Sequence, residues 1–268
     1  MTAKWVREGT GRYREAVELL ELFDCSLWLG SPEGFPLASE LQPEEMKKEM
    51  DAHFITGGLV SHWLGNTLSA QAGNKALIES STFFSEHLYS VWTGLPLYPA
   101  DVPPLPGTGK PHRQMRGVRI FPASHNYVIE DWVIGSLCEW LILHNMPLFV
   151  WHTEVQWAAL HRFALRYPQL TIILETQTKK ILYHTRVLFS LMRECPNIFV
   201  ETSNFAGTGY IEYAVRELGA GRLIFGSFLP VNDPFVGIGM ILDADIQDRD
   251  KLRIASQNLR RIVQEVSL

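Results

Sequence analysis

Short apolar or β-branched runs alternate with amphipathic stretches along this 268-residue chain, and this alternation limits the folds open to it. Several of the runs are unbroken, as expected for parallel strands that are buried on both faces. Strands that are each followed by a helical stretch predict an α/β protein, a (β/α)8 TIM barrel rather than an open doubly wound sheet. No Gly-x-Gly-x-x-Gly follows the first run, which argues against a dinucleotide-binding sheet. The eight expected strands are 22–27, 56–62, 88–92, 117–121, 147–151, 171–174, 198–201 and 222–226.

Helical patterns lie between these strands and form the second half of the prediction. The tail 248–266 is expected to be a final helix that packs on the barrel, with Asp248 as its N-cap. Residues 96–112 are rich in proline and glycine and predict a long loop after the third strand. We find no linker and no internal repeat, so 1–268 is expected to be a single domain. The other expected helices are 40–52, 65–87 (as one helix or two), 130–145, 155–167, 179–194 and 207–218.

Composition restricts the location and the partners of the protein. Hydrophobic residues make up 46% of the chain, but no apolar run approaches the roughly 20 residues needed to span a bilayer. The first residues lack the apolar core of a signal peptide, so a cytoplasmic protein without membrane attachment is expected. The net charge of −5 and the lack of a basic stripe argue against a nucleic-acid partner. Cys25, Cys138 and Cys195 are widely spaced and are expected to be reduced and buried.

Five segments together resemble the amidohydrolase-related family, whose members include hydrolases, lactonases and decarboxylases on a (β/α)8 barrel. Each segment is a weak signal alone, but their order and spacing make the set specific. The resemblance covers the chain from Phe23 onward and implies an amidohydrolase-like barrel. The matching segments are 117–122 (GVRIFP), 147–153 (PLFVWHT), 163–174 (FALRYP into LTIIL), 197–203 (NIFVETS) and 222–227 (RLIFGS).

The same resemblance locates the family's metal ligands, and most of the residues there cannot bind a metal. Residues 23–30 (FDCSLWLG) stand where the family has Asp-x-His-x-His, and 225–230 (FGSFLP) stand where it has Gly-Ser-Asp-x-Pro. A zinc-type site needs about three ligands from His, Cys, Asp or Glu. We therefore expect a dismantled metal site and no cofactor. The five positions implied by the resemblance are Ser26, Trp28, His152, Thr176 and Phe228, of which only His152 matches.

Asp24, His152 and Glu175 are the candidate catalytic residues, and three interpretations of them remain open. Carboxylates that end the first and sixth strands would face the barrel mouth beside His152 and could form an acid/base group. The same three could be a rebuilt site for a divalent metal with two carboxylates and one histidine. Alternatively, Asp24 caps a backbone turn, Glu175 pairs with an arginine, and His152 is satisfied by a neighbour.

Other residues at the mouth are candidates for ligand binding. Trp28 and Phe228 replace small polar ligands with large rings, which either plug the mouth or provide a stacking platform for an aromatic ligand. Arg119 could bind a carboxylate with both arms of its guanidinium, or could be structural. The expected ligand is a small molecule that carries a carboxylate or an aromatic ring. The remaining ligand-binding candidates are Ser26, His125, Tyr127, Thr176 and Ser203, and His62, Trp63 and Trp92 are expected to line the same mouth.

Three functions are consistent with these residues. The first is a small-molecule-binding barrel with little or no metal-dependent hydrolase activity. The second is a metal-independent hydrolase, lactonase or decarboxylase in which His152 is the general base. The third is a structural or assembly subunit, and a homo-oligomer would fit it.

Overall fold

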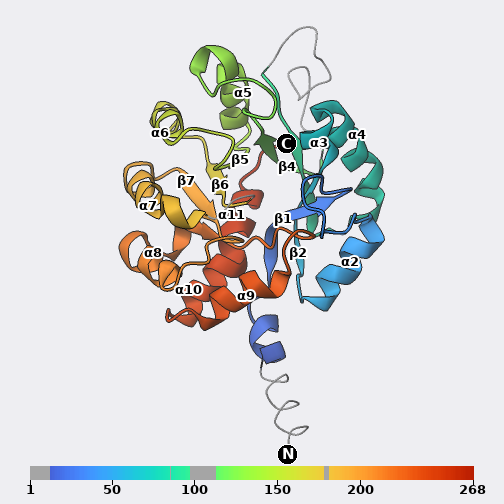
Figure 1. The fold of residues 1–268 in the computed structure, drawn as a ribbon, viewed down its shortest axis with the longest axis vertical. Helices are drawn as coiled ribbons and strands as arrows, with labels where there is room; N and C mark the ends of the chain where they lie inside the picture. The colour runs from blue at the N-terminus through green and yellow to red at the C-terminus, as the bar shows by residue number, and fades with distance from the viewer. Residues whose placement is uncertain (1–12, 85, 97–112, 178–180) are drawn as a thin grey trace, which may run out of the picture.

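Eight parallel strands form one sheet in the order β1 to β8, and helices surround it (Figure 1). The computed structural model describes residues 13–84, 86–96, 113–177 and 181–268. The sheet closes through backbone hydrogen bonds from Cys25 N to Phe225 O (3.1 Å) and from Trp28 N to Leu229 O (3.1 Å). All eight predicted strands are confirmed. They are β1 Phe23–Leu29, β2 Gly57–His62, β3 Leu88–Thr93, β4 Met115–Ile120, β5 Leu148–Trp151, β6 Ile172–Glu175, β7 Ile198–Glu201 and β8 Leu223–Ile224.

The predicted helices are present with shifted ends, and 65–87 divides into two α-helices and a 3-10 turn. The expected helix 179–194 and loop 96–112 fall partly outside the described residues. The helices are α2 Pro43–Ala52, α3 Leu64–Thr67, α4 Ala70–Ser80, α5 Asp131–Leu143, α6 Trp157–Arg166, α7 Thr185–Glu194, α8 Tyr210–Leu218, α9 Pro234–Asp243, α10 Asp248–Leu252 and α11 Asn258–Gln264, with the 3-10 segments η1 Ser81–Phe83, η2 Ile181–His184 and η3 Ala220–Arg222 and the π-turn η4 Arg253–Gln257.

Two details of the C-terminal third differ from the sequence prediction. Helix α9 was not predicted, because its sequence PFVGIGMILD is apolar on nearly every side and contains two glycines. The prediction that Asp248 is an N-cap was wrong. Gln247 has the extended backbone of the cap residue, and Asp248 is the first residue of α10.

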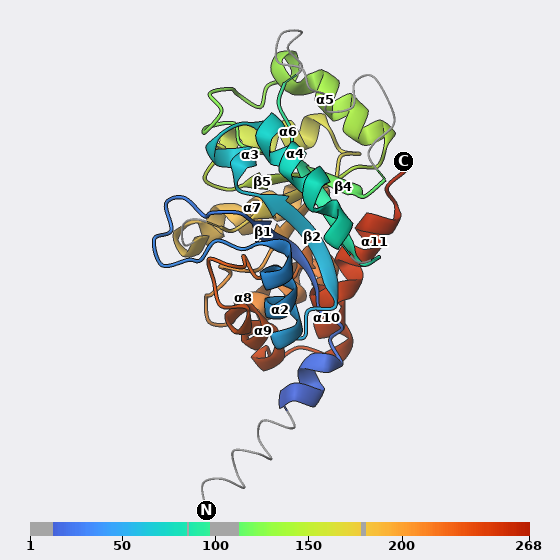
Figure 2. The ribbon, with the colours of Figure 1, turned by 90° about the vertical axis from the view of Figure 1, so that its right-hand side faces the viewer.

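Helix α11 closes the amino-terminal end of the barrel. Leu259, Ile262 and Val263 pack in one cluster with inward-facing strand residues such as Cys25 and Phe149. Figure 2 shows α11 on the opposite side of the barrel from the loop that follows β1. The end that remains for a site is therefore the carboxyl end of the strands, where this fold places its active sites.

The π-turn that precedes α11 is tied to the end of β8. Phe225 N donates to the carbonyl of Ile254 at 2.9 Å. Asn258, which is buried, donates to the carbonyls of Ala220 and Leu223 at 2.8 Å each. The terminal helix thus holds the short strand β8 in place.

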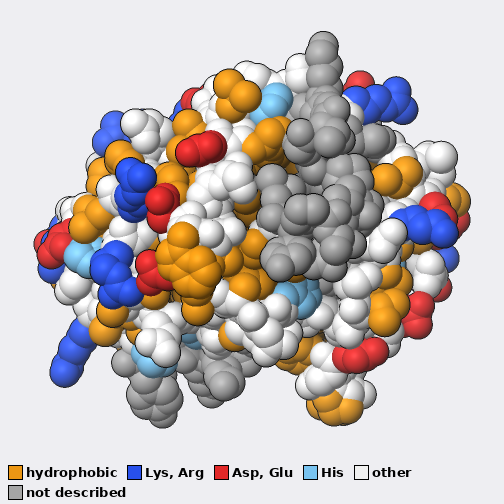
Figure 3. All heavy atoms as spheres, turned by 90° about the horizontal axis from the view of Figure 1, so that it is seen from above, with side chains coloured by type: hydrophobic (Ala, Val, Ile, Leu, Met, Phe, Trp, Pro, Cys, Tyr) orange, Lys and Arg blue, Asp and Glu red, His pale blue; other side chains and the backbone are white. Residues whose placement is uncertain are grey.

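The structure also bears on two predictions from composition. Cys25, Cys138 and Cys195 are free and buried, as expected. Among the described residues, no helix has the length and apolar character needed to cross a bilayer. On the face seen in Figure 3, acidic and basic side chains are interspersed rather than gathered by sign.

Candidate site at the carboxyl end of the barrel

A buried ion pair between Arg119 on β4 and Glu175 at the end of β6 lies inside the barrel. The guanidinium binds the carboxylate with both arms, Nε to Oε2 at 2.8 Å and Nη2 to Oε1 at 2.5 Å. The side chains are 2% and 0% exposed, so the pair has lost almost all contact with water. Burial raises the pKa of Glu175, and the charge and hydrogen bonds of Arg119 oppose that shift. This geometry agrees with the structural interpretation of Glu175, in which its carboxylate pairs with an arginine.

Two polar side chains bind this pair, and a third is hydrogen-bonded to one of them. Arg119 Nη1 donates to the hydroxyl of Ser61 on β2. Gln177 Nε2 donates to Glu175 Oε1 at 3.2 Å and also to the hydroxyl of Ser26. Ser26 in turn accepts from Trp28 Nε1 at 3.2 Å. Buried charges of this kind persist only when their remaining donors and acceptors are satisfied, so these residues form one polar layer across the barrel.

Asp24 connects β1 to the segment after β8. Its Oδ1 accepts the backbone N–H of Ser26 at 2.8 Å and that of Ser227 at 3.0 Å. Burial raises the pKa of Asp24 to about 6, while these hydrogen bonds oppose the shift. Asp24 therefore holds the backbone where the barrel closes, as the structural alternative describes.

Glu201, at the end of β7, is a third buried carboxylate of the layer, and sequence reasoning did not select it. It accepts from the backbone N–H and hydroxyl of Thr176 at 3.1 and 3.2 Å. It also accepts from the backbone N–H of Ser203 and, at 3.0 Å, from the Ser203 hydroxyl. Burial and the neighbouring Glu175 raise the pKa of Glu201 to about 8. A Cβ at Gly226 would collide with the Glu201 side chain, so this carboxylate requires glycine there.

An aromatic cluster, defined here as Trp28, Trp63, Phe121, Trp151 and Phe228, covers the polar layer. Trp28 is at its centre, with ring centroids 4.6 Å from Trp63 and 5.6 Å from Trp151. The Arg119 guanidinium carbon lies 4.4 Å from the centroid of the Trp28 ring. A guanidinium over an indole face is a favourable cation–π contact. The rings of the cluster thus pack on one another, and Trp28 also contacts the ion pair below them.

Phe228 holds its place in the cluster with a strained backbone. Its φ is +59°, a left-handed conformation that is unusual for a bulky residue. Its ring packs against Trp63 at 6.0 Å and Phe35 at 5.6 Å. Trp28 and Phe228 are each only 1% exposed, which is the geometry of a plug rather than of an open stacking surface.

His152 lies at the rim of the mouth, directly after β5. It is 5% exposed, and its Nδ1 is 3.3 Å from the carbonyl oxygen of Glu175. Because a carbonyl only accepts, this contact requires the proton on Nδ1. The ring is 6.2 Å from Trp157 and 6.1 Å from His184, and Trp157 Nε1 donates to His184 Nδ1 at 3.3 Å. His152 thus belongs to a rim of three aromatic side chains.

The other sequence candidates are distributed around this centre. His125 is partly buried and approaches the carbonyl of Asn66 at 3.4 Å, and the Tyr127 hydroxyl reaches the carbonyl of Gly94 at 3.5 Å. Trp63 joins the aromatic cluster, as expected of a residue that lines the mouth. Trp92 does not, because it points outward into the cluster between strands and helices.

The residues at the mouth do not fit a metal ion. Among the described residues, no group of three or more His, Cys, Asp and Glu side chains is placed to hold one. Both oxygens of Glu175 bind Arg119, and Oδ1 of Asp24 binds two backbone N–H groups. A metal at Asp24, His152 and Glu175 would have to displace the guanidinium.

Solved structures share this architecture at low sequence identity. An uncharacterised TIM-barrel protein from Bordetella bronchiseptica is 14% identical, with 91% of this chain and 98% of that chain covered and a TM-score of 0.68. An amidohydrolase from Burkholderia multivorans with bound zinc is 14% identical, with 91% and 99% covered and a TM-score of 0.69. The 5-carboxyvanillate decarboxylase from Sphingomonas paucimobilis is 14% identical, with the same coverage and a TM-score of 0.66. No protein-family model and no curated protein matches the chain.

The fold is a TIM barrel, similar to those of solved amidohydrolases and decarboxylases. This agreement confirms the resemblance derived from the five segments at the level of fold. Identities this low carry no activity, substrate or cofactor across to this chain.

Sequence reasoning missed some members of the site for identifiable reasons. Glu201 is the last residue of an apolar strand, as Glu175 is, and that shared signal could have selected it. Gln177 and Ser61 carry no such signal, because uncharged polar residues after or within a strand are common. Gln177 is close to Glu175 in the sequence, but only the folded barrel brings Ser61 to Arg119, 58 residues away.

Arg119→Met should destabilise the protein by about 3–5 kcal/mol, because it leaves the Glu175 carboxylate buried without its cation. The double variant Arg119→Met/Glu175→Gln should lose clearly less than the sum of the two single changes. Urea unfolding of the four proteins measures this coupling. Arg216→Met removes an exposed ion pair with Glu217 and serves as a control that should change stability by less than about 1 kcal/mol. Additive losses in the double variant would show that the pair is not a unit.

Glu201→Gln should flatten the pH dependence of stability between pH 6 and pH 9. The folded pKa of Glu201 is raised from 4.5 to about 8, so its contribution is full below the unfolded pKa and is lost as the pH rises through about 8. The folded pKa of Asp24 is raised to about 6, so the contribution of Asp24 to the pH dependence of stability falls mostly below this window. The free energy of unfolding, measured at several pH values for wild type and Glu201→Gln, tests this prediction. Glu79→Gln is the control, because Glu79 is exposed. Equal slopes in wild type and Glu201→Gln would contradict the prediction.

Proposed function

We propose that this chain is an amidohydrolase-related barrel that binds a small molecule at its mouth and has little or no metal-dependent hydrolase activity. The observation that carries the proposal is the engagement of Glu175 by Arg119 under the aromatic cluster. The positions that the resemblance assigns to metal ligands hold Ser26, Trp28, Thr176 and Phe228, which all have structural contacts of their own. Binding a metal there would require breaking several of these contacts at once.

Two buried donors indicate the chemistry of the ligand. The indole N–H groups of Trp63 and Trp151 have no acceptor among the described residues, and both side chains are buried. A buried donor without a partner costs about 1–3 kcal/mol. An acceptor oxygen on a ligand would recover that energy, provided that the partly buried Phe35 and Val231 move aside.

An aromatic carboxylate combines an acceptor oxygen with a ring that suits this mouth. Aromatic pockets with a few convergent polar groups are typical small-molecule sites. Two of the similar structures are decarboxylases whose names specify aromatic acids, 5-carboxyvanillate and 2,6-dihydroxybenzoate. The rim of His152, Trp157 and His184 gives such a ring a further surface to contact.

The catalytic alternative, in which His152 is a general base, has less support. Arg119 was the expected anchor for the carboxylate of the substrate, but it is 1% exposed and both arms are engaged by Glu175. A substrate carboxylate would have to compete with Glu175 in the barrel interior. No observation among the described residues favours the assembly alternative, so a homo-oligomer stays an expectation.

Protein purified without chelator and without a metal-binding tag should contain well under one equivalent of zinc, iron or manganese. Elemental analysis by plasma mass spectrometry measures this content. Added EDTA, or added zinc or manganese, should leave the melting temperature unchanged, because no three ligands converge in the part of the chain that the structure describes. One equivalent of any of these metals, with a melting temperature that falls on chelation, would contradict the dismantled site.

Trp63→Phe and Trp151→Phe should each weaken binding of 2,6-dihydroxybenzoate by about tenfold or more. The change keeps a ring but removes the N–H that donates to a charged acceptor. Isothermal titration calorimetry measures the affinity, and Trp132→Phe is the control because Trp132 is 82% exposed on α5. Affinities equal to wild type in both cluster variants would show that the indole N–H groups do not bind the ligand.

A further inference from the structure

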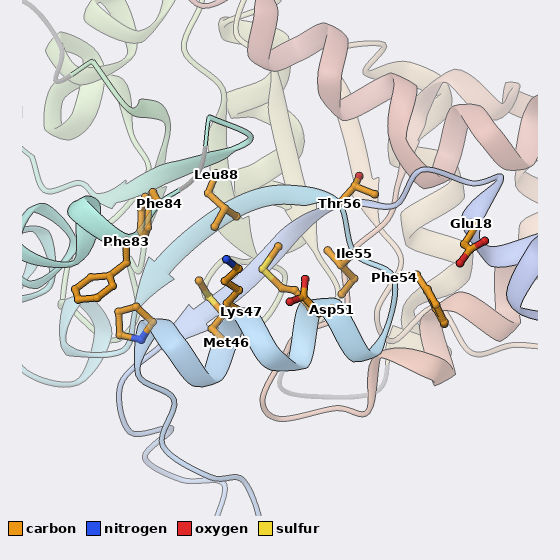
Figure 4. A pocket seen from close by; sticks show the side chains of 12 residues that line it. Glu18, Met46, Lys47, Asp51, Phe54, Ile55, Thr56, Phe83, Phe84 and Leu88 are labelled. Carbon is orange, nitrogen blue, oxygen red and sulfur yellow. The ribbon is translucent and has the colours of Figure 1, made fainter.

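A pocket of about 510 Å³ lies on the outer wall of the barrel, away from the mouth. Its lining comes from α2, from residues 54–56 that lead into β2, and from η1 and the start of β3 (Figure 4). Small-molecule sites in proteins commonly enclose about 300–1,000 Å³. None of its lining residues belongs to the polar layer or the aromatic cluster, so any ligand here is independent of the proposed function at the mouth.

The pocket has an apolar floor and an apolar wall. Met46, Met50, Ile55 and Leu88 are buried and form the floor. Methionine side chains are flexible and polarisable and adapt to ligands of different shape. Phe83 stands beside them with 56% of its surface exposed, which is apolar area that a ligand would cover.

A strained residue forms the far end of the same pocket. Phe54 follows α2 with φ +59°, at the position where glycine is the usual residue because a side chain is strained there. The next residue, Ile55, donates its N–H to the carbonyl of Met50 at 2.9 Å, which closes the end of the helix. Strained positions of this kind are often kept where the side chain is used. Here the ring of Phe54 lines the pocket.

Two opposite charges lie on the pocket side of α2 without partners. Lys47 and Asp51 are one helical turn apart and both line the pocket. Neither side chain forms a hydrogen bond or ion pair with any residue that the structure describes, and they do not pair with each other. Glu18, the third charged residue of the lining, is bound by Arg14 at 2.9 Å. The pocket thus offers one free cation and one free anion beside an apolar floor, counted among the described residues.

We propose that this pocket binds a free α-amino acid with a large apolar side chain. The α-carboxylate contacts Lys47, the α-ammonium contacts Asp51, and the side chain lies on Met46, Met50 and Leu88. A ligand with only a negative charge would bring its carboxylate close to that of Asp51, and a ligand with only a positive charge would meet Lys47. A zwitterion can pair with both Lys47 and Asp51, and its apolar side chain can pack on the floor of the pocket.

Titration of the ¹⁵N-labelled protein with L-phenylalanine tests the proposal, with amide shifts followed by NMR. We expect a dissociation constant on the order of 1 mM, since the site is open and the ligand is small. N-acetyl-L-phenylalanine, which lacks the cation, and L-phenylalaninamide, which lacks the anion, should each bind at least tenfold more weakly. Glycine, which has no apolar side chain, should not bind measurably. Equal affinity for phenylalanine and either blocked derivative would overturn the proposal.

Substitutions on α2 locate the site. Lys47→Met and Asp51→Asn should each weaken phenylalanine binding about tenfold, and these exposed changes should leave the fold intact. Lys48→Met is the matched control, because Lys48 is exposed on the same helix but does not line the pocket. Its affinity should equal that of wild type. Lys47→Met and Lys48→Met with the same affinity, or no phenylalanine binding by wild type, would refute the inference and leave the proposal for the mouth untouched.

Discussion

The ion pair of Arg119 and Glu175 determines the organisation of the barrel's carboxyl end. Removing two charges from water is costly, and an excellent geometry with further hydrogen bonds is needed to offset it. Both conditions are met, because the guanidinium binds with both arms and Ser61 and Gln177 satisfy the remaining groups. Ser61 lies on β2, and Gln177 follows β6 two residues after Glu175. The pair therefore links β4 to β6 and, through Ser61, to β2 across the interior of the barrel.

The layer that contains the pair carries more acid than base. Asp24, Glu175 and Glu201 are all fully buried, and Arg119 is the buried cation beside them. Hydrogen bonds from backbone N–H groups and from Thr176 and Ser203 compensate for part of the missing positive charge. The raised pKa values of Asp24 and Glu201 show that this compensation is incomplete. As a consequence, the stability of the protein depends on pH, which would not be the case for an apolar layer.

The aromatic cluster and the outer pocket place two different surfaces on one scaffold. At the mouth, large rings occupy the interior space above Arg119, and little of them reaches water. On the outer wall, α2 and the start of β2 leave a hollow with a charged rim and an apolar floor. Hydrolases and decarboxylases among the similar structures share this fold, so the barrel alone does not determine what a surface binds. The side chains at each surface determine it.

The sequence by itself determined the barrel, because strands buried on both faces are mostly apolar and amphipathic helices separate them. It also identified His152, Trp28 and Phe228 as residues of the mouth, since they follow or end strands. Helix α9 escaped prediction because a helix that is apolar on nearly all sides has no periodic pattern. The partners of each side chain were decided only by the tertiary structure. Arg119 meets Glu175 across 56 residues, and Gln177 meets Ser26 across 151, because strand register and barrel closure bring them together. Whether a strand-end carboxylate is free or neutralised depends on that register, which no local pattern records.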